Sequence, residues 1–271
     1  MEKKWFVALL MVVVMMCACW TGAVADEERK TFTSGDYQYA LLDDGTVEIA
    51  GYKGSADLLA IPAELDGKAV TSIGDCAFYL CSSLTSVSIP DSVEQIGTNP
   101  FAACFELKTI SVSPEHPYFA TIDGVLFRKA DKALISYPAS ISSSTYTIPQ
   151  GITSIGDSAF FYCDSLTSFS IPDSITAIGD SAFFWCSSLT SVSIPDSVTS
   201  IGDSAFSYCD SLTSVSIPDS VTSIGDEAFY SCSSLTSVNI PDSVTSIGDR
   251  AFYYCDSLTS VSIPDSVTSI G

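Results

Sequence analysis

The residues that could do chemistry in this 271-residue chain recur at a fixed interval. One series holds cysteines 23 residues apart: Cys163, Cys186, Cys209, Cys232 and Cys255. Two more series hold aspartates at the same interval: Asp173, Asp196, Asp219, Asp242 and Asp265, and Asp157, Asp180, Asp203, Asp226 and Asp249. Thiols form disulfides or bind zinc, and clustered carboxylates hold calcium. Each series therefore has a chemical and a structural interpretation.

The cysteines fit a structural role best. Of the ten, Cys17 and Cys19 lie in a predicted leader, and all the others except Cys76 share one phase of the repeat. Stacked neighbours would point the same way, which does not suit a disulfide dihedral angle near 90°. We therefore expect buried, reduced thiols, with Cys76 and Cys81 as the best candidates for a bridge. No short CxxC pair is present, so no metal site is predicted.

The aspartates allow two interpretations. Calcium between successive repeats would relieve a repulsion of roughly 0.8 kcal/mol between carboxylates about 5 Å apart in water. Alternatively, each carboxylate caps a turn by accepting backbone N–H groups. No DxDxDG-type loop is present, and capping is favoured. A third series alternates two residue types, which separates its charges: Asp164, Ser187, Asp210, Ser233 and Asp256.

Hydroxyl groups line the polar side of the predicted main strand. They form two series: Ser168, Ser191, Ser214, Ser237 and Ser260, and Ser170, Ser193, Ser216, Asn239 and Ser262. These residues are the candidate ligand-binding face, a broad and shallow surface for protein or glycan, and the alternative is an inert solvated face. Aromatic residues, which dominate binding hot spots, lie just before the cysteines: Phe161, Tyr162, Phe184, Trp185, Tyr208, Tyr230, Tyr253 and Tyr254.

Composition argues against an enzyme and against a nucleic-acid-binding protein. The only histidine is His116, and no GxSxG nucleophile motif is present, so no catalytic residue and no cofactor is predicted. The 32 acidic residues outnumber 11 basic ones, giving a formal charge of −21. A nucleic-acid-binding protein needs a basic face to displace the counterions of phosphate.

Residues 1–25 have the layout of a secretory signal peptide. Lys3 and Lys4 precede an apolar run, and Ala23-Val24-Ala25 is a small-x-small site, which predicts cleavage between Ala25 and Asp26. A retained membrane anchor and a lipoprotein junction at Cys19 are the less favoured alternatives. Cleavage leaves 9 basic and 31 acidic residues and a charge of −22. No later apolar stretch is long enough to span a membrane, so we expect a secreted or cell-surface protein.

The repeat itself predicts how these residues are positioned. The unit reads LTSVSIPDSVTSIGDSAFxxC, and a period of 23 residues predicts a solenoid. Thr-Ser-Val-Ser-Ile alternates as a half-buried strand, and proline ends it. Val-Thr-Ser-Ile is a second extended piece, and Gly-Asp makes a turn. Asp-Ser-Ala-Phe-x-x-Cys predicts a single helical turn.

The pattern LxxVxIPxxVxxIGxxAFxxCxx resembles the BspA-like leucine-rich repeats of bacterial surface proteins, over about Leu58 to Gly271. The resemblance implies a β-rich α/β solenoid. This would be a right-handed leucine-rich repeat array of 23-residue units, with short strands on the concave side and single helical turns. It also implies adhesion or protein binding at the cell surface, and it carries no catalytic residue over to this chain.

Two regions depart from the repeat. In residues 26–57, two alternating runs around Asp43-Asp44-Gly45 predict a β-hairpin cap before the repeats of 58–113. Residues 114–147 form an atypical longer unit, with strands predicted at 118–122, 125–127 and 133–137 and an exposed basic group at Arg128, Lys129 and Lys132. Repeats resume over 148–271 and end in mid-repeat, which predicts a truncated chain.

Together these features predict a non-catalytic protein that binds an extracellular protein or glycan, with host matrix among the candidates. The alternative is an acidic structural spacer that presents another domain, with calcium as a potential stabiliser of the coil. The sequence does not distinguish oligomeric states.

Overall fold

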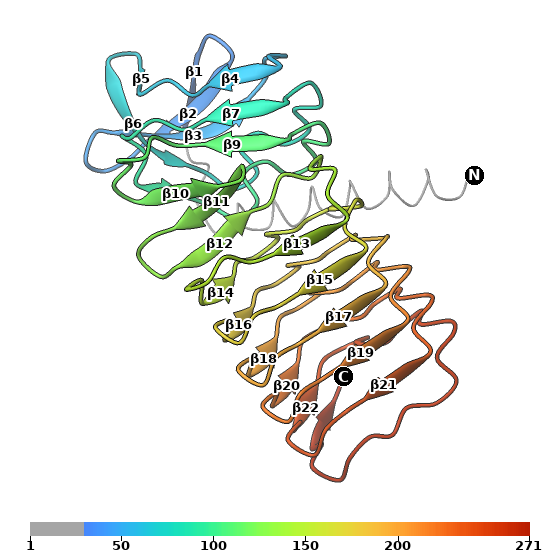
Figure 1. The fold of residues 1–271 in the computed structure, drawn as a ribbon. Helices are drawn as coiled ribbons and strands as arrows, with labels where there is room; N and C mark the ends of the chain where they lie inside the picture. The colour runs from blue at the N-terminus through green and yellow to red at the C-terminus, as the bar shows by residue number, and fades with distance from the viewer. Residues whose placement is uncertain (1–29) are drawn as a thin grey trace.

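The repeat unit folds into one rung that contains two short strands and a long series of turns. A computed structural model describes residues 30–271. In the rung that begins at Leu189, β17 (Ser191–Ser193) is followed by Ile194-Pro195, where the strand ends because proline has no N–H to donate. The second strand is β18 (Ser200–Ile201), and turns then lead to Cys209. Successive rungs stack along the molecule from the blue end to the red end (Figure 1).

The first strands of successive rungs form a parallel sheet. Its order is β13 (Thr145–Thr147), β15 (Ser168–Ser170), β17, β19 (Ser214–Ser216) and β21 (Ser237–Asn239). Each residue pairs with its equivalent 23 positions later, as Val192 does with Val215, and the pairing of Asn239 with Ser262 continues the sheet. Because the register equals the repeat, identical side chains lie above one another.

The second strands form another face of the coil. Their nine-stranded sheet runs in the order β10 (Phe119–Ile122), β11 (Val125–Arg128), β12 (Ala133–Ser136), β14 (Ser154–Ile155), β16 (Ala177–Ile178), β18, β20 (Ser223–Ile224), β22 (Ser246–Ile247) and β23 (Ser269–Ile270). The strands expected in the atypical unit are present. β12 pairs in parallel with β14, so this unit is built into the sheet and continues the array.

The N-terminal part of the coil is built from two smaller sheets. The first contains β1 (Thr31–Ser34), β2 (Tyr37–Leu41), β3 (Val47–Tyr52), β5 (Glu64–Leu65), β6 (Lys68–Ile73) and β8 (Gln95–Ile96). The second contains β4 (Leu58–Ala60), β7 (Ser86–Ser88) and β9 (Thr109–Ser111). β2 and β3 form an antiparallel hairpin, and β3 joins β6 in parallel, which connects the hairpin to the first repeat.

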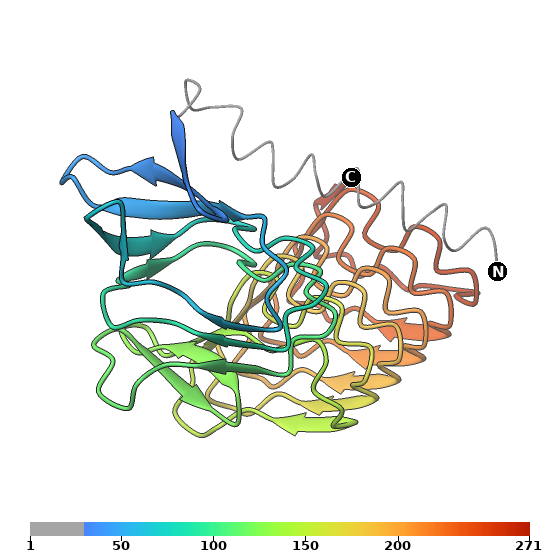
Figure 2. The same ribbon diagram turned by 90° about the horizontal axis from the view of Figure 1, so that it is seen from above.

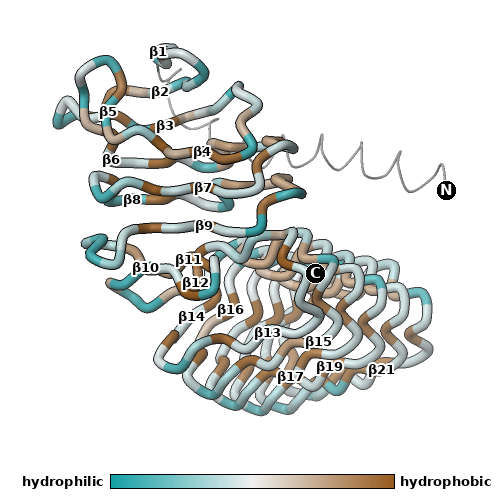
Figure 3. The backbone as a smooth tube through the Cα atoms, turned by 45° about the horizontal axis from the view of Figure 1, so that its top comes forward, coloured by the Kyte–Doolittle hydropathy of each residue, from teal (hydrophilic) through white to brown (hydrophobic). Residues whose placement is uncertain are grey.

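The core is a set of one-residue columns that run the length of the coil. The rings of Phe160, Phe183, Phe206 and Phe229 are fully buried, with centroids 4.9–5.4 Å apart and planes within 7° of parallel. Figure 3 shows the apolar stripes that these repeated positions make across successive rungs. No rung encloses this surface by itself, so each rung depends on its neighbours for burial.

The expected helical turn is wrong: residues 30–271 contain no helix, and the fold there is a β-solenoid. The turn segment carries two left-handed residues per rung, for example Ser204 (φ 53°) and Tyr208 (φ 61°). Its N–H groups also alternate between two kinds of acceptor. Ala205 and Ser207 donate within the segment, whereas Phe206 and Tyr208 donate to carbonyls of the next rung. A helix needs all of these N–H groups for its own ladder.

The cysteine series is a column of buried free thiols. Cys186, Cys209, Cys232 and Cys255 each place Sγ 3.1–3.3 Å from the carbonyl oxygen of the phenylalanine 26 residues earlier. This agrees with the expectation of reduced, apolar filling. The proposed Cys76–Cys81 bridge is wrong, because Cys81 is a free thiol. Its Sγ faces the same phase as the other thiols, so it packs as one of the column.

Candidate functional site

The ten hydroxyl and amide residues predicted to bind ligand follow one face of the coil. Eight of them lie on β15, β17, β19 and β21, and each flanks a buried or half-buried apolar residue such as Phe169, Val192 or Val215. Ser260 and Ser262 extend the same two columns by one rung. Ser168 is half-buried and the other nine are exposed. The structure therefore brings all ten together on one continuous face.

These ten side chains differ from the other repeated hydroxyls in having no protein partner. The threonine before each strand donates to the preceding rung, as Thr190 does to the carbonyl of Thr167 at 2.9 Å. The serine after Pro-Asp does the same, as Ser220 does to Val198 at 2.6 Å. Within residues 30–271, none of the ten face residues makes a side-chain hydrogen bond. Their polar atoms remain available to a ligand.

One aspartate series caps the turns of the coil. The Oδ1 atom of Asp157, Asp180, Asp203 and Asp226 accepts the N–H of the aspartate in the next rung, at 2.7–2.9 Å. Asp75 accepts from Thr98 in the same way. This is the capping role favoured from the sequence. Among the residues that the structure describes, no group of three or more His, Cys, Asp or Glu side chains is placed to hold a metal ion.

The alternating series puts a donor beside a carboxylate. The Oγ and N–H groups of Ser187 both donate to Oδ1 of Asp164, at 2.7 and 3.2 Å. Carboxylates at every second rung therefore avoid direct contact with one another, and the serine between them supplies hydrogen bonds in place of repulsion.

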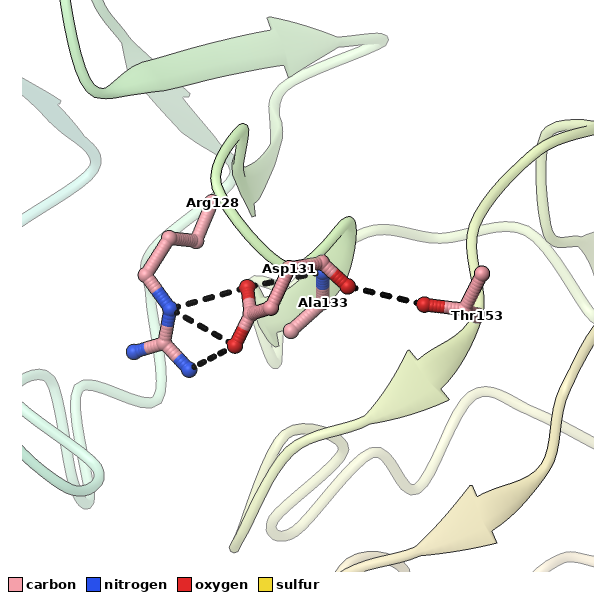
Figure 4. A network of polar contacts seen from close by, with 4 residues as sticks. All are labelled: Arg128, Asp131, Ala133 and Thr153. Carbon is pink, nitrogen blue, oxygen red and sulfur yellow. Dashed lines mark hydrogen bonds and ion pairs between the residues drawn. The ribbon is translucent and has the colours of Figure 1, made fainter.

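The basic residues of the atypical unit lie at its surface. Arg128 is half-exposed and forms a bidentate pair with Asp131, with contacts of 2.7–3.1 Å. The guanidinium lowers the pKa of the Asp131 carboxyl. The same carboxylate accepts the N–H of Ala133, and the Asp131 carbonyl accepts from Thr153 (Figure 4). Exposed Lys129 donates to the carbonyl of His116 at 2.6 Å, and Lys132 is also exposed.

His116 is a structural residue in this fold. It is fully buried, with Nε2 3.1 Å from the carbonyl oxygen of Pro90. Nδ1 accepts the N–H groups of Tyr118 and Phe119, both at 3.2 Å. Burial lowers the pKa of His116, which keeps the ring neutral and suits this arrangement. Both ring nitrogens are therefore engaged by backbone.

The aromatic residues before the cysteines form a continuous surface strip, which we call the aromatic ridge. It comprises Phe161, Tyr162, Phe184, Trp185, Tyr208, Tyr230, Tyr253 and Tyr254, together with Phe105. Phe105 was not singled out from the sequence, because the atypical unit breaks the period between it and its neighbour. Its ring centroid lies 4.7 Å from that of Tyr162, which is 57 positions away. Only the aromatic residue that follows Cys104 gave a signal in the sequence.

The largest hollow, of about 310 Å³, lies against the last rung. Its walls include Ile240, Phe252 and Ile270, which occupy core positions of the repeat. A hollow walled by such apolar positions has no set of converging polar groups to orient a small molecule.

Two of the predicted site residues, Ala25 and Asp26, lie outside the described residues. Within residues 30–271, no helix is long and apolar enough to cross a membrane.

Comparisons with solved structures place the fold among bacterial leucine-rich repeat proteins. A leucine rich cell surface protein from Faecalibacterium prausnitzii is 25% identical, with a TM-score of 0.58 over 91% of this chain and 95% of that one. A leucine-rich repeat protein from Bacteroides ovatus is 29% identical, with a TM-score of 0.55 over 89% of this chain and 61% of that one. One from Eubacterium ventriosum, 20% identical, has a TM-score of 0.62 over 89% and 93% of the two chains and shares the fold.

Comparison at the level of families gives the assignment. No curated protein sequence matches the chain. The profile of the family described as "BspA type Leucine rich repeat region" matches six copies, over residues 63–145 and 153–271. These ranges include most of the atypical unit and all of the stacked rungs that follow it. The chain belongs to the BspA-type leucine-rich repeat family.

Proposed function

We propose that this protein is a secreted or cell-surface binding module that recognises an extracellular protein or glycan, host matrix included, and has no catalytic activity. The proposal includes a right-handed coil with the serine-lined sheet on its concave side. Family membership supports a surface role, and the neighbour from Faecalibacterium prausnitzii is described as a cell surface protein. A solenoid exposes a long surface for its mass, which suits recognition of large ligands.

The observation that carries the proposal is the contrast between hydroxyl groups on the same rungs. Thr190, Thr213 and Ser220 use their hydroxyls to join neighbouring rungs. The serines of the sheet face leave theirs unpaired and exposed in two parallel columns. Polar groups without an internal partner can exchange water for a ligand at little cost to the fold.

The absence of catalysis is supported by the state of His116. Its ring is buried and both nitrogens bond to backbone, so it has no free lone pair for a substrate proton. The serines of the sheet face therefore have no described imidazole to activate them.

Secretion can be tested at residues 1–25. Expression of the full chain in a bacterium with a secretory pathway should yield an exported protein that begins at Asp26, because signal peptidase cleaves after small-x-small sites. N-terminal sequencing of the exported protein reports the cleavage site. Retention of residues 1–25 on an exported protein would contradict this part of the proposal.

Binding is tested with the full chain against arrays of purified matrix proteins and glycans. Ser193→Tyr with Ser216→Tyr adds bulk to the middle of the sheet face, at strand positions where tyrosine is well tolerated. We expect at least a tenfold loss of affinity for the ligand identified. Thr199→Tyr with Thr222→Tyr adds the same bulk to exposed positions on the adjoining segment of the same two rungs, and it should bind as the parent does.

Far-UV circular dichroism and thermal melting confirm that both double variants fold. Equal binding by both double variants would contradict the assignment of the site to the sheet face. A folded parent that binds nothing on either array would contradict the proposed function and favour the spacer.

A further inference from the structure

The aromatic ridge is a second surface with chemistry of its own. Its rings form an unbroken chain, with centroids 5.7 Å apart between Tyr162 and Trp185, 5.1 Å between Trp185 and Tyr208, and 5.3 Å between Tyr208 and Tyr230. The rings are half-buried up to Tyr230, whereas Tyr253 and Tyr254 are 50% and 53% exposed. The sheet face has no aromatic residue pointing outward, so the two surfaces differ in character.

The backbone holds the ridge outward at some cost. Tyr162, Trp185, Tyr208 and Tyr254 adopt left-handed φ values of 59–61°. Such values cost an L-residue about 1–2 kcal/mol and are common where function requires them. The segment is held there by bonds to the next rung, such as Trp185 N–H to the carbonyl of Ser207 at 2.9 Å. The ridge is therefore rigid before any partner arrives.

Carboxylates accompany the ridge at every second rung. Asp164, Asp210 and Asp256 each follow a ridge tyrosine by two residues. Burial, and then the charge of Asp164, raises the pKa of Tyr162, and Asp210 contributes to the raised pKa of Tyr208 in the same way. These charges therefore lie close enough to act on the rings.

The surroundings contain almost no positive charge. Arg250 is the only basic residue after Lys132, against fourteen acidic residues, and it is paired with Glu227 at 3.2 Å. The strip therefore combines aromatic contact area with uncompensated negative charge, which selects for a cationic partner.

The spacing of the carboxylates defines the partner further. Neighbouring rungs are about 4.8 Å apart, so carboxylates at every second rung are about 9.6 Å apart. A polyproline II chain rises about 3.1 Å per residue, so every third side chain returns to the same side after about 9.3 Å. Extended chains of this kind pack their prolines on aromatic surfaces. The two repeats agree closely over the three carboxylates.

We propose that the aromatic ridge binds a proline-rich segment of a partner protein that carries arginine at every third residue. The prolines pack against the rings, and the arginines pair with Asp164, Asp210 and Asp256. A guanidinium suits this position because it is planar, permanently charged and able to bond a carboxylate with two donors. The proposal goes beyond the sheet face and does not depend on it.

The test uses synthetic peptides and the full chain at about 0.15 M salt, where distant charges are screened. A labelled (Arg-Pro-Pro)4 peptide should bind, and a peptide with the same arginines separated by single prolines should bind at least fivefold more weakly. Asp164→Asn with Asp210→Asn and Asp256→Asn should weaken binding at least tenfold. The matched control, Asp173→Asn with Asp219→Asn and Asp265→Asn, removes three charges from another exposed column and should change affinity less than twofold.

Two further variants complete the test. Tyr208→Ser places in the ridge a residue that the same position of the next rung, Ser231, already carries, so the fold should tolerate it while peptide affinity falls at least fivefold. The difference in tryptophan emission between the parent and Trp185→Phe isolates the signal of the ridge, and this signal should change on binding.

Several results would overturn the proposal. These are no binding of (Arg-Pro-Pro)4, equal binding of both peptide spacings, or equal loss in the two aspartate triples, which would indicate attraction to the acidic coil in general. The Ser193→Tyr, Ser216→Tyr variant should bind the peptide as the parent does. The two surfaces can thus fail independently.

Discussion

At the scale of single residues, repetition turns one favourable contact into a series. The carboxylate of Asp203 accepts the N–H of Asp226 at 2.8 Å, and the N–H of Asp203 is accepted by Asp180. The same arrangement brings like charges near one another, which opposes the hydrogen bonds. The net effect depends on which of the two is removed.

Asp203→Asn keeps the accepting oxygen and removes the charge, so we expect unchanged or slightly higher stability. Asp203→Ala removes the acceptor as well and should cost about 1 kcal/mol, as loss of a cap does. Chemical denaturation of both variants at low and at high salt measures the difference. Equal destabilisation by Asn and Ala would show that Asp203 has no capping role.

A second residue-scale feature is the left-handed position at Ser204, where φ is 53°. Glycine reaches this region without the strain that a Cβ atom introduces. Ser204→Gly should therefore raise the unfolding free energy by about 0.5–1 kcal/mol, and the β-branched substitution Ser204→Val should lower it. Thermal melting gives the order, and a less stable glycine variant would contradict it.

At the scale of elements, the columns are the units of stability. The buried thiols and the phenylalanine rings each fill one column, and each thiol points at a carbonyl two elements away. Burial raises the pKa of Cys209 and Cys232 well above the ordinary 9.0, and that of Cys255 to about 11. A column of thiols is stable only while the thiols stay protonated.

This linkage predicts alkaline destabilisation. The stabilising contribution is fully present below the ordinary thiol pKa and is lost as the pH rises from there toward the raised folded value, by up to about 1.4 kcal/mol per pH unit for each thiol. Denaturation midpoints between pH 7 and pH 10.5 should fall steeply. Cys209→Ala should start lower at pH 7, because it leaves a cavity, and then fall less steeply. Parallel curves for parent and variant would rule the linkage out.

At the scale of the whole molecule, the register of 23 residues makes each rung exchangeable with the next. Phe119, Leu126 and Leu134 of the atypical unit are buried and continue the core, so the array passes through residues 114–147 without interruption. Figure 2 shows the array from above, with the blue and green strands on one side and the yellow to red rungs on the other.

Deletion of residues 202–224 removes one complete rung and joins Ile201 to Gly225, which restores the original Ile-Gly junction. The variant should fold with the same type of circular dichroism spectrum and a modestly lower denaturation midpoint, because array stability is roughly a sum over rungs. Deletion of residues 202–213 breaks the register and should abolish cooperative unfolding of the following rungs. Cooperative unfolding in both variants would contradict the dependence on register.

Much of this architecture could be predicted from one rung. The alternation in Thr-Ser-Val-Ser-Ile predicts the strand and its exposed face, and the period predicts the stacking, because both depend on local pattern alone. The capping aspartates follow from residue type and position. The expected helical turn failed, because a capping residue followed by apolar positions also fits a chain of turns whose N–H groups bond to a neighbouring rung.

The printed residues alone thus determined the period, the inward side of each strand and the chemistry of every series. Only the tertiary structure decided the partner of each group. Cys81 packs as a free thiol, Phe105 meets Tyr162 across the atypical unit, and the sheet serines stay unpaired while the neighbouring threonines do not. The reason is physical: side-chain type and spacing act within a rung, whereas hydrogen bonds and ring contacts form between rungs, where distance along the chain carries no information about distance in space.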